Sequence, residues 1–348
     1  MTQVGMTRTA IVLFNLGGPD SPQAVQPFLQ NLFSDPAILT VPAPIRWLLA
    51  RLISRRRAPV AQKIYEQLGG RSPILPNTEA QAQALEAALG GEAKVFIAMR
   101  YWHPFVEETV AEVKAWAPDR VVLLPLYPQF STTTTASSFD AWDRAATSIG
   151  FACATARICC YPDEAGFVAA SARLLGIALD RASGPVRVLF SAHGLPKKIV
   201  DAGDPYAWQV RRSAEAIVAA LGHGVDWTLC YQSRVGPLEW IGPSTEAEIR
   251  RAAADKVTPV VVPLSFVSEH SETLVELDEE YRHLAESVGV PGYLRVPTVS
   301  TDPAFIAGLA TLARSAPDGL SSNCGGRICP AAHGRCPHGK RSREARAA

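Results

Sequence analysis

The sequence predicts an α/β protein of two similar lobes, each with a parallel sheet covered by helices on both faces. Short β-branched runs alternate with longer amphipathic segments, and the runs are continuously apolar, as in strands buried on both faces. This alternation occurs twice, on either side of a boundary near residue 165. The length of 348 residues also suits two lobes better than one.

Each predicted element follows from its local pattern. Strands are expected at residues 10–14, 94–99, 120–124, 186–191, 226–231 and 257–266. Helices are expected at residues 22–33, 79–89, 104–116, 165–179, 207–221 and 271–288. Because ligands bind beyond the carboxyl ends of parallel strands, the residues that follow each strand are the candidate site. Aromatic, hydroxyl and imidazole side chains gather there, which suits a flat, largely apolar ligand with a few polar anchors.

Composition excludes several classes of protein. Apolar residues make up 47% and charged residues 19%, the balance of a globular protein with a real core. The net charge of +1 provides no general attraction for nucleic acid. No apolar run approaches the roughly 20 residues that a membrane-spanning helix needs. The seven cysteines are scattered rather than arranged as a disulfide framework, which indicates a reducing, cytoplasmic setting.

The turn after the first strand, Gly17-Gly18-Pro19, is a natural place for a phosphate-binding loop. Both the G-x-G-x-x-G and the G-x-x-x-x-G-K-[ST] spacings are absent there, so a tight turn is the better interpretation.

His193 is the strongest single candidate for chemistry. It follows a predicted buried strand and precedes Gly194, where a ligand can approach the backbone closely. An imidazole titrates near neutral pH, so it can accept a proton or bind a metal ion. The alternative is a histidine at a strand end that bonds to the backbone, and the residues alone leave both open.

The second candidate is an acidic segment. If a helix begins near Ser268, then Glu269, Glu272, Glu276 and Glu280 form one stripe. Stacked carboxylates repel one another unless protons or a cation relieve them. The stripe is either a solvated helix face, which is the commoner case, or a wet channel for cations and protons.

The C-terminal stretch is unusually rich in cysteine. Cys324, Cys329 and Cys336 lie close together, with His333 and His338 nearby. The spacing matches no standard zinc-finger framework, but such crowding favours a metal centre over incidental thiols in a disordered tail.

Residues 41–53 are apolar and are followed by Arg55, Arg56 and Arg57. They form either an ordinary helix packed on the first lobe or a lip that touches a membrane.

Seven strings, in this order, closely resemble those of ferrochelatases, the enzymes that insert ferrous iron into a porphyrin. They are VLFNLGGPD at 12–20, GGRSPI at 69–74, RYWHP at 100–104, LYPQFS at 126–131, SAHGLP at 191–196, YQSRVGPLEWIGP at 231–243 and FVSEHSETLVELD at 266–278. The likeness covers about residues 8–315, and the SAHGLP and SEHSETLVELD strings together are highly specific.

The resemblance implies roles for particular residues. His193 matches the family's proton acceptor and iron ligand, and Glu272 matches its partner across the porphyrin. His270, Glu276 and Glu269 match residues on the path of iron or protons. The implied porphyrin-binding positions are Leu16, Arg100, Tyr101, Tyr127, Ser233 and Trp240.

The fold that the resemblance implies is two Rossmann-like lobes with four-stranded parallel sheets and an active-site cleft between them. The lobes are expected at 8–165 and 166–301, followed by a helix at 302–318 that packs back on the first lobe and a cysteine-containing tail at 319–348.

Some ferrochelatases hold a [2Fe–2S] cluster with cysteines of a C-terminal extension and one internal cysteine. Cys324, Cys329 and Cys336 fit the extension, but Thr132 occupies the position of the animal enzymes' internal cysteine. Cys160 or Cys159 is therefore the preferred fourth ligand, ahead of Cys153 and Cys230.

The implied function is protoporphyrin ferrochelatase, a lyase that forms protohaem in the terminal step of haem synthesis. Its expected partners are protoporphyrin IX and ferrous iron. Peripheral contact with the inner face of the membrane is also compatible with this interpretation, and the oligomeric state is left open. One alternative is a coproporphyrin ferrochelatase or a related chelatase for another metal. Another is a tetrapyrrole carrier without turnover, although a carrier has no need of a proton acceptor such as His193 opposite an acidic helix.

Overall fold

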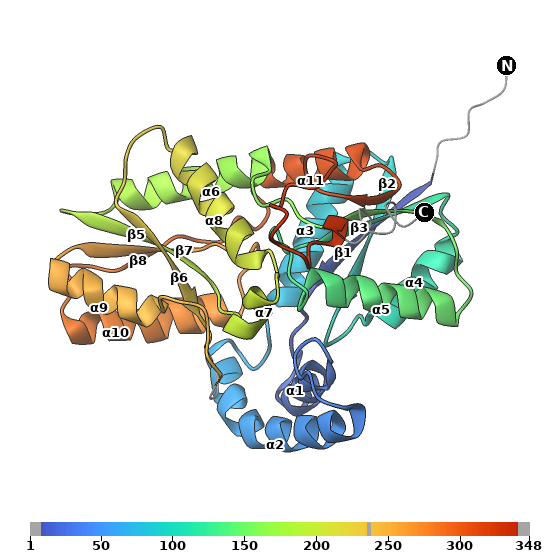
Figure 1. The fold of residues 1–348 in the computed structure, drawn as a ribbon, viewed down its shortest axis with the longest axis horizontal. Helices are drawn as coiled ribbons and strands as arrows, with labels where there is room; N and C mark the ends of the chain where they lie inside the picture. Colours follow the sequence, from blue (N-terminus) through green and yellow to red (C-terminus); the bar gives the residue numbers. More distant parts are fainter. Residues whose placement is uncertain (1–7, 235–237, 340–348) are drawn as a thin grey trace. The chain divides into compact units, whose positions relative to one another are not determined.

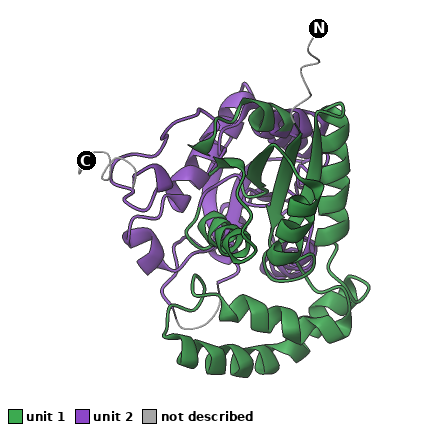
Figure 2. Ribbon diagram, turned by 90° about the vertical axis from the view of Figure 1, so that its right-hand side faces the viewer, with its two compact units in different colours: residues 1–127, 131–159, 310–321 green, residues 128–130, 160–309, 322–348 purple. Residues whose placement is uncertain are grey.

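The computed structural model describes residues 8–234 and 238–339, and the chain divides into two compact units (Figures 1 and 2). Unit 1 comprises Met1–Tyr127, Ser131–Cys159 and Ala310–Ser321. Unit 2 comprises Pro128–Phe130, Cys160–Leu309 and Ser322–Ala348. The last residues of the expected tail, 340–348, lie outside the described residues. In the described ranges, every helix is too short or too polar to cross a lipid bilayer.

Unit 1 contains a parallel sheet in the order β2-β1-β3-β4-β9. Its strands are β1 (Thr9–Asn15), β2 (Ala93–Met99), β3 (Arg120–Pro125), β4 (Ala154–Ile158) and β9 (Gly319–Ser321). The expected four strands are thus joined by a fifth, which pairs with β4 from Ala156↔Gly319 to Ile158↔Ser321. The sequence does not reveal β9 because three residues, one of them glycine, are too few to show a periodic pattern.

Helices connect the strands of unit 1. They are η1 (Pro22–Ala24), α1 (Val25–Ser34), α2 (Ala43–Gln67), α3 (Ile74–Ala88), α4 (Val106–Trp116) and α5 (Thr135–Ser148). α1 and α2 pack together through a small core that includes Val25, Phe28 and Tyr65 and reaches Tyr101 beyond β2. The apolar segment at 41–53 is therefore the first half of a long helix, α2.

Unit 2 contains a parallel sheet in the order β6-β5-β7-β8. Its strands are β5 (Val186–His193), β6 (Trp227–Gln232), β7 (Thr258–Pro263) and β8 (Leu294–Arg295). Its helices are α6 (Ala165–Asp180), α7 (Lys197–Asp201), α8 (Tyr206–Ala220), α9 (Thr245–Asp255), η2 (Glu272–Glu280) and α10 (Tyr281–Val288). A last helix, α11 (Pro303–Ser315), begins in unit 2 and ends in unit 1.

Both faces of the second sheet are buried, which explains the continuous apolar runs of its strands. Val188 and Phe190 face the core that contains residues of α6 and α8, whereas Leu189, between them, belongs to the core with α9 and α10. Figure 1 shows α6 and α8 on one side of this sheet and α9 and α10 on the other. The alternation follows from the two-residue period of a strand.

Several predicted elements differ from the structure. The helix expected at 79–89 begins earlier, at Ile74, and the one expected at 22–33 begins with the short helix η1. The strand expected at 257–266 ends at Pro263, after which the chain turns. The helix expected at 271–288 is two helices in succession: η2 is a π-helix with i→i+5 bonds, and α10 is an α-helix. The amphipathic pattern alone cannot distinguish them because both bury one face of the helix.

Candidate active site

His193 and Glu272 face each other at the carboxyl end of the second sheet. His193 is the last residue of β5, and Glu272 is the first residue of η2. Nε2 of His193 lies 3.6 Å from Oε2 of Glu272. The two side chains are 38% and 27% exposed, so a ligand can reach both.

The proton on the His193 ring can be assigned from its other nitrogen. Nδ1 lies 2.7 Å from the carbonyl oxygen of Gly194, which can only accept a hydrogen bond. Nδ1 of the neutral ring therefore carries the proton, and Nε2 presents a lone pair to the Glu272 carboxylate. Two acceptors that face each other at 3.6 Å suit a proton or a metal cation bound near both.

Glu276 lies one turn further along η2 and is held by several donors. Its carboxylate accepts hydrogen bonds from the backbone N–H of Ser233 at 2.8 Å, the Ser233 hydroxyl at 2.5 Å and the Tyr281 hydroxyl at 2.8 Å. Burial and the charge of Glu272 nevertheless raise the pKa of Glu276, because they outweigh these donors. Glu276 thus keeps a proton to higher pH than an ordinary glutamate does.

Ser233 brings the two carboxylates together. Its backbone has φ +59°, a conformation that few residues other than glycine adopt. This strained position directs the Ser233 hydroxyl toward Glu276, and the same oxygen lies 3.5 Å from Oε2 of Glu272. Strain of this kind is concentrated at functional sites.

His270 lies in the loop before η2, and its Nε2 is 4.0 Å from Oε2 of Glu272. Burial lowers the pKa of His270, against the opposing charges of Glu272 and Glu269. The ring therefore stays neutral near physiological pH. The Phe266 ring, which the sequence analysis did not single out, packs against both imidazoles, with centroids 4.6 Å from His270 and 6.4 Å from His193.

The predicted acidic stripe is wrong at its first residue, Glu269. Glu269 precedes η2, and its carboxylate is bound by Arg295 at 2.6 Å and by the backbone N–H of Thr298 at 2.9 Å. Glu280, at the other end, is exposed. The stripe assumed an α-helix from Ser268, but the helix begins later and is a π-helix, so Glu272 and Glu276 are the two acids that meet at Ser233.

Trp240 lies close to the loop that follows His193. Trp240 pairs with Pro196 in an isolated antiparallel bridge. A Cβ atom on Gly194 would lie 3.2 Å from the Trp240 ring and 2.9 Å from the carbonyl oxygen of Gln232. Glycine is therefore required at 194, because the end of β6 and the Trp240 ring leave no room for a larger side chain.

A second group of predicted residues lies in unit 1. Arg100 donates a hydrogen bond from Nη2 to Asp35 at 2.8 Å and one from Nε to the Ser137 hydroxyl at 2.8 Å. The Tyr101 hydroxyl also donates to Asp35 at 2.8 Å. Burial would raise the pKa of Asp35, but the Arg100 charge and these hydrogen bonds hold it below its ordinary value. Asp35 is thus the hub of this group, and burial together with its negative charge raises the pKa of Tyr101.

Asp35 was not among the predicted site residues, although its sequence context carries one signal. It is a single acidic residue that follows the apolar helix α1 and precedes Pro36, where a helix must end. Tyr127 follows β3 in the same unit, and burial raises its pKa. Leu16 follows β1 and is packed at the edge of the core between α1 and α2.

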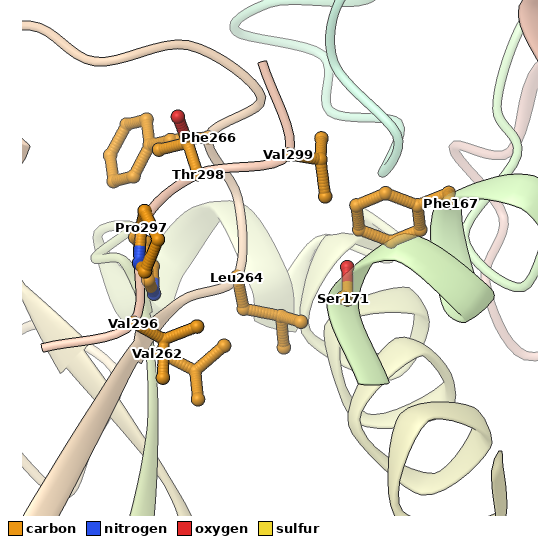
Figure 3. A pocket seen from close by; sticks show the side chains of 10 residues that line it. Phe167, Ser171, Val262, Leu264, Phe266, Val296, Pro297, Thr298 and Val299 are labelled. Carbon is orange, nitrogen blue, oxygen red and sulfur yellow. The ribbon is translucent and has the colours of Figure 1, made fainter. Parts of the chain in front are cut away.

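A small cavity lies beside Phe266 in unit 2 (Figure 3). It is lined by Phe167, Ser171, Val262, Pro263, Leu264, Phe266, Val296, Pro297, Thr298 and Val299. The lining is mostly apolar and contains neither His193 nor Glu272, so the cavity is a packing feature next to the site and not the site itself.

The cysteines of the tail gather around α8. Cys329 and Cys336 are buried, and Nε2 of Gln209 donates to Sγ of Cys329 at 3.1 Å. Cys160 interacts electrostatically with Cys329, whereas Cys159 belongs to unit 1. Cys324 is exposed.

The chemistry of these thiols suits a metal. Cys329 donates a hydrogen bond to Cys336 and lowers the pKa of Cys336 to about 6, against the effect of burial, with help from the Arg327 and His338 charges. A thiolate is the form of cysteine that binds metals. Across residues 8–234 and 238–339, however, no three or more His, Cys, Asp or Glu side chains are already arranged to hold a metal ion. The donor chemistry fits a cluster, but the ligand set is not pre-assembled.

Comparison with solved structures first supports the class of fold. The chain is similar to the solved structure of SirB from Bacillus subtilis with Fe3+, with a TM-score of 0.51 and 13% identity over 89% of this chain and 95% of that one. At this identity the likeness shows the fold alone, which is an α/β fold with two parallel sheets, each covered by helices.

Sequence comparison then decides the family. Residues 8–316 match the ferrochelatase family. The ferrochelatase of Caulobacter vibrioides (strain NA1000 / CB15N) is 55% identical over 341 residues, 95% of this chain and 97% of that protein. The ferrochelatase of Phenylobacterium zucineum (strain HLK1) is 54% identical over 337 residues, 94% of this chain and 97% of that protein. The chain therefore belongs to the ferrochelatase family.

Proposed function

We propose that the chain is a lyase that inserts ferrous iron into protoporphyrin IX and so forms protohaem, the terminal step of haem synthesis. The observation that carries the proposal is the pair of facing acceptors, Nε2 of His193 and Oε2 of Glu272, 3.6 Å apart. Insertion of a cation with release of protons is the chemistry that such a pair assists. The relatives named ferrochelatase support the choice of iron and porphyrin.

The reaction replaces two protons by one Fe²⁺. Two pyrrole N–H bonds break, the iron forms bonds to the four ring nitrogens, and both protons leave the macrocycle, so charge balances. A gap of 3.6 Å between Nε2 of His193 and Oε2 of Glu272 is too narrow for a macrocycle to lie between them, so the two groups act from the same side of the ring rather than across it. Nε2 of His193 accepts a pyrrole proton, and Glu272 and Glu276 beside it receive iron or the second proton. Bending the ring exposes its nitrogens, and binding energy from the rest of the macrocycle supports that distortion.

Other residues are proposed to bind the porphyrin. In unit 2 these are Ser233 and Trp240, which lie near Glu276 and Gly194 respectively. His270 and Glu269 would support the iron or proton path, His270 directly beside Glu272 and Glu269 through its bond to Arg295. The porphyrin-binding residues proposed in unit 1 are Leu16, Arg100, Tyr101 and Tyr127.

Anaerobic absorption spectra of the purified chain with ferrous iron and a porphyrin test the function. Haem bands that appear at a catalytic rate are expected, with protoporphyrin IX metallated faster than coproporphyrin. Faster reaction with coproporphyrin would instead support a coproporphyrin ferrochelatase. A porphyrin that binds and is never metallated would leave only a tetrapyrrole carrier and refute the enzyme.

We also propose that the tail binds a [2Fe–2S] cluster through Cys324, Cys329, Cys336 and Cys160. The lowered pKa of Cys336 supports the tail cysteines as ligands, and Cys160 is preferred over Cys159 because it belongs to the same unit as the tail. When bound, such a cluster supplies one-electron redox chemistry. Gln209 donates to the Cys329 sulfur, and Arg327 places positive charge near Cys336, so both side chains would stabilise cluster-bound sulfur.

Finally, we propose a cytoplasmic protein that contacts the inner face of the membrane through α2. Ile45, Leu48 and Leu52, spaced i, i+3 and i+7, are 51%, 60% and 57% exposed, and Trp47 beside them is 57% exposed. Arginines border this apolar face at positions 46, 51, 55, 56 and 57. An apolar face with a basic edge favours an anionic lipid surface.

A further inference from the structure

The π-helix η2 carries both carboxylates of the proposed site, Glu272 and Glu276. A π-helix is rare because i→i+5 bonds leave the turn wider and less well packed than in an α-helix. Nine residues in this conformation therefore need contacts from outside the helix to hold them. Those contacts determine where the two carboxylates lie.

Arg295, the last residue of β8, binds both ends of this region. Its Nη1 donates to Oε1 of Glu269 at 2.6 Å, three residues before η2 begins. Its Nε donates to Oδ1 of Asp278 at 3.0 Å, and Nη2 donates to Oδ2 of the same carboxylate, near the end of η2. A single guanidinium thus joins residues on either side of Glu272 and Glu276.

The surroundings of Arg295 strengthen its ion pairs with Glu269 and Asp278. The Arg295 side chain is 9% exposed, so solvent screens its ion pairs weakly. The fork to Asp278 is bidentate, a geometry that lysine cannot reproduce. The backbone N–H of Thr298 adds a 2.9 Å bond to Glu269, and the Tyr293 hydroxyl donates to the carbonyl oxygen of Leu277. The chain at and around β8 therefore holds the segment just before η2 and the last part of η2.

We infer that Arg295 is a positioning residue for iron insertion, which keeps η2 in its π conformation so that Glu272 faces His193 and Glu276 faces Ser233. This inference rests on the proposed function of the site. If the attachment is lost, the helix can close at i→i+4, and Glu276 then rotates about the helix axis relative to Glu272. The hydrogen bonds from Ser233 to Glu276 would break, although no residue of the site is changed.

Unit 2 offers a matched control. Arg187 on β5 is 13% exposed and also bridges two carboxylates, Asp226 and Asp255, each at 2.7 Å. Neither partner belongs to η2. Arg187→Gln therefore removes a comparable ion-pair bridge without releasing the helix.

The experiment compares Arg295→Gln, Arg295→Lys and Arg187→Gln in the full chain. For Arg295→Gln we expect kcat to fall by about 100-fold, the scale of a misplacement of about 1 Å, with a smaller change in KM for the porphyrin. The kcat of Arg295→Lys should be little higher than that of Arg295→Gln, whereas Arg187→Gln should keep wild-type kinetics. Equal kinetics for the Arg295→Gln and Arg187→Gln variants would overturn the inference.

Hydrogen exchange of the backbone amides provides a readout that does not depend on turnover. Exchange in 272–280 should rise about tenfold or more in Arg295→Gln and stay unchanged in Arg187→Gln. If Arg295→Gln does not fold, Asp278→Asn, which weakens only the bidentate half, should show the same local rise. Unchanged exchange in this segment refutes the anchoring role. Absence of haem formation by the wild-type chain would refute the proposed function instead.

Discussion

Nε2 of His193 lies 3.6 Å from Oε2 of Glu272, while Nδ1 of the same ring faces the carbonyl oxygen of Gly194. The carbonyl decides which nitrogen carries the proton, and the strand end and the π-helix decide which oxygen faces the other nitrogen. A base is thereby placed opposite a carboxylate before any ligand arrives. Such preorganisation avoids a reorganisation cost during the reaction.

Replacing His193 by alanine should lower the rate of haem formation by about 10²–10⁴-fold, the usual contribution of a general base. Porphyrin binding, followed by the quenching of porphyrin fluorescence, should change little. His103→Ala is a suitable control, because His103 is exposed and paired with Glu108 at 2.9 Å in unit 1. Normal metallation by the His193→Ala variant would remove His193 from the mechanism.

Ser233→Ala should move the acid limb of the rate–pH profile to higher pH. The Ser233 hydroxyl stabilises ionised Glu276, so its loss raises further a pKa that burial and Glu272 already raise. A more basic Glu276 needs a higher pH to ionise. Measurement of kcat/KM against pH checks this, with Ser287→Ala on α10 as a control remote from Glu276. An acid limb that stays in place would show that Glu276 does not govern it.

Asp35→Asn should destabilise unit 1 by about 3 kcal/mol at pH 7, since it leaves the Arg100 guanidinium without its carboxylate partner. The pKa of Asp35 is lowered in the folded state, so its stabilisation is present above the ordinary aspartate pKa and lost as pH falls through the folded value. The difference from wild type should therefore shrink in acid. Urea denaturation at several pH values measures it.

The exposed ion pair of Asp143 with Arg157 provides the control for this variant. Asp143→Asn should cost less than about 1 kcal/mol, as expected for a surface pair. Equal losses for the two variants would contradict the role of Asp35 as a hub.

Cys160→Ser should abolish the visible absorption of a [2Fe–2S] cluster, whereas Cys159→Ser should retain it. The adjacent residues differ because only Cys160 belongs to unit 2 with the tail cysteines. Anaerobic purification followed by absorption and electron paramagnetic resonance of the reduced protein distinguishes the two variants. Retention of the cluster by the Cys160→Ser variant would exclude Cys160 as a ligand.

Glutamate substitution of Leu48 and Leu52 on α2 should weaken binding to anionic phospholipid vesicles by at least tenfold, because it removes apolar contact and adds repulsion. The rate of haem formation with detergent-dispersed porphyrin should stay close to that of the wild-type chain. Vesicle sedimentation measures the first effect, with glutamate substitution of Ile149, 38% exposed after α5, as the control. Equal vesicle binding by both variants would refute the membrane contact.

Much of the fold could be predicted because the pattern of burial is local. Strands buried on both faces, such as β5 and β7, appear as continuous apolar runs, and the alternation with helices predicts parallel sheets. β9 could not be predicted, because three residues gain strand geometry only by pairing with β4. The π conformation of η2 is hidden for a related reason, since it depends on contacts from β8.

The features of the candidate site also divide into those that sequence order determines and those that only the folded chain determines. The sequence by itself determined that His193 follows a buried strand, that Glu272 and Glu276 share one helix, and that three cysteines crowd the tail, because these are facts of order and spacing. Only the tertiary structure decided that Glu269 pairs with Arg295, that Asp35 gathers Arg100 and Tyr101, and that Cys160 belongs to the same unit as Cys329. Those relations join residues distant in the chain, and the energy of an ion pair or hydrogen bond depends on separation in space, which spacing in the sequence does not contain.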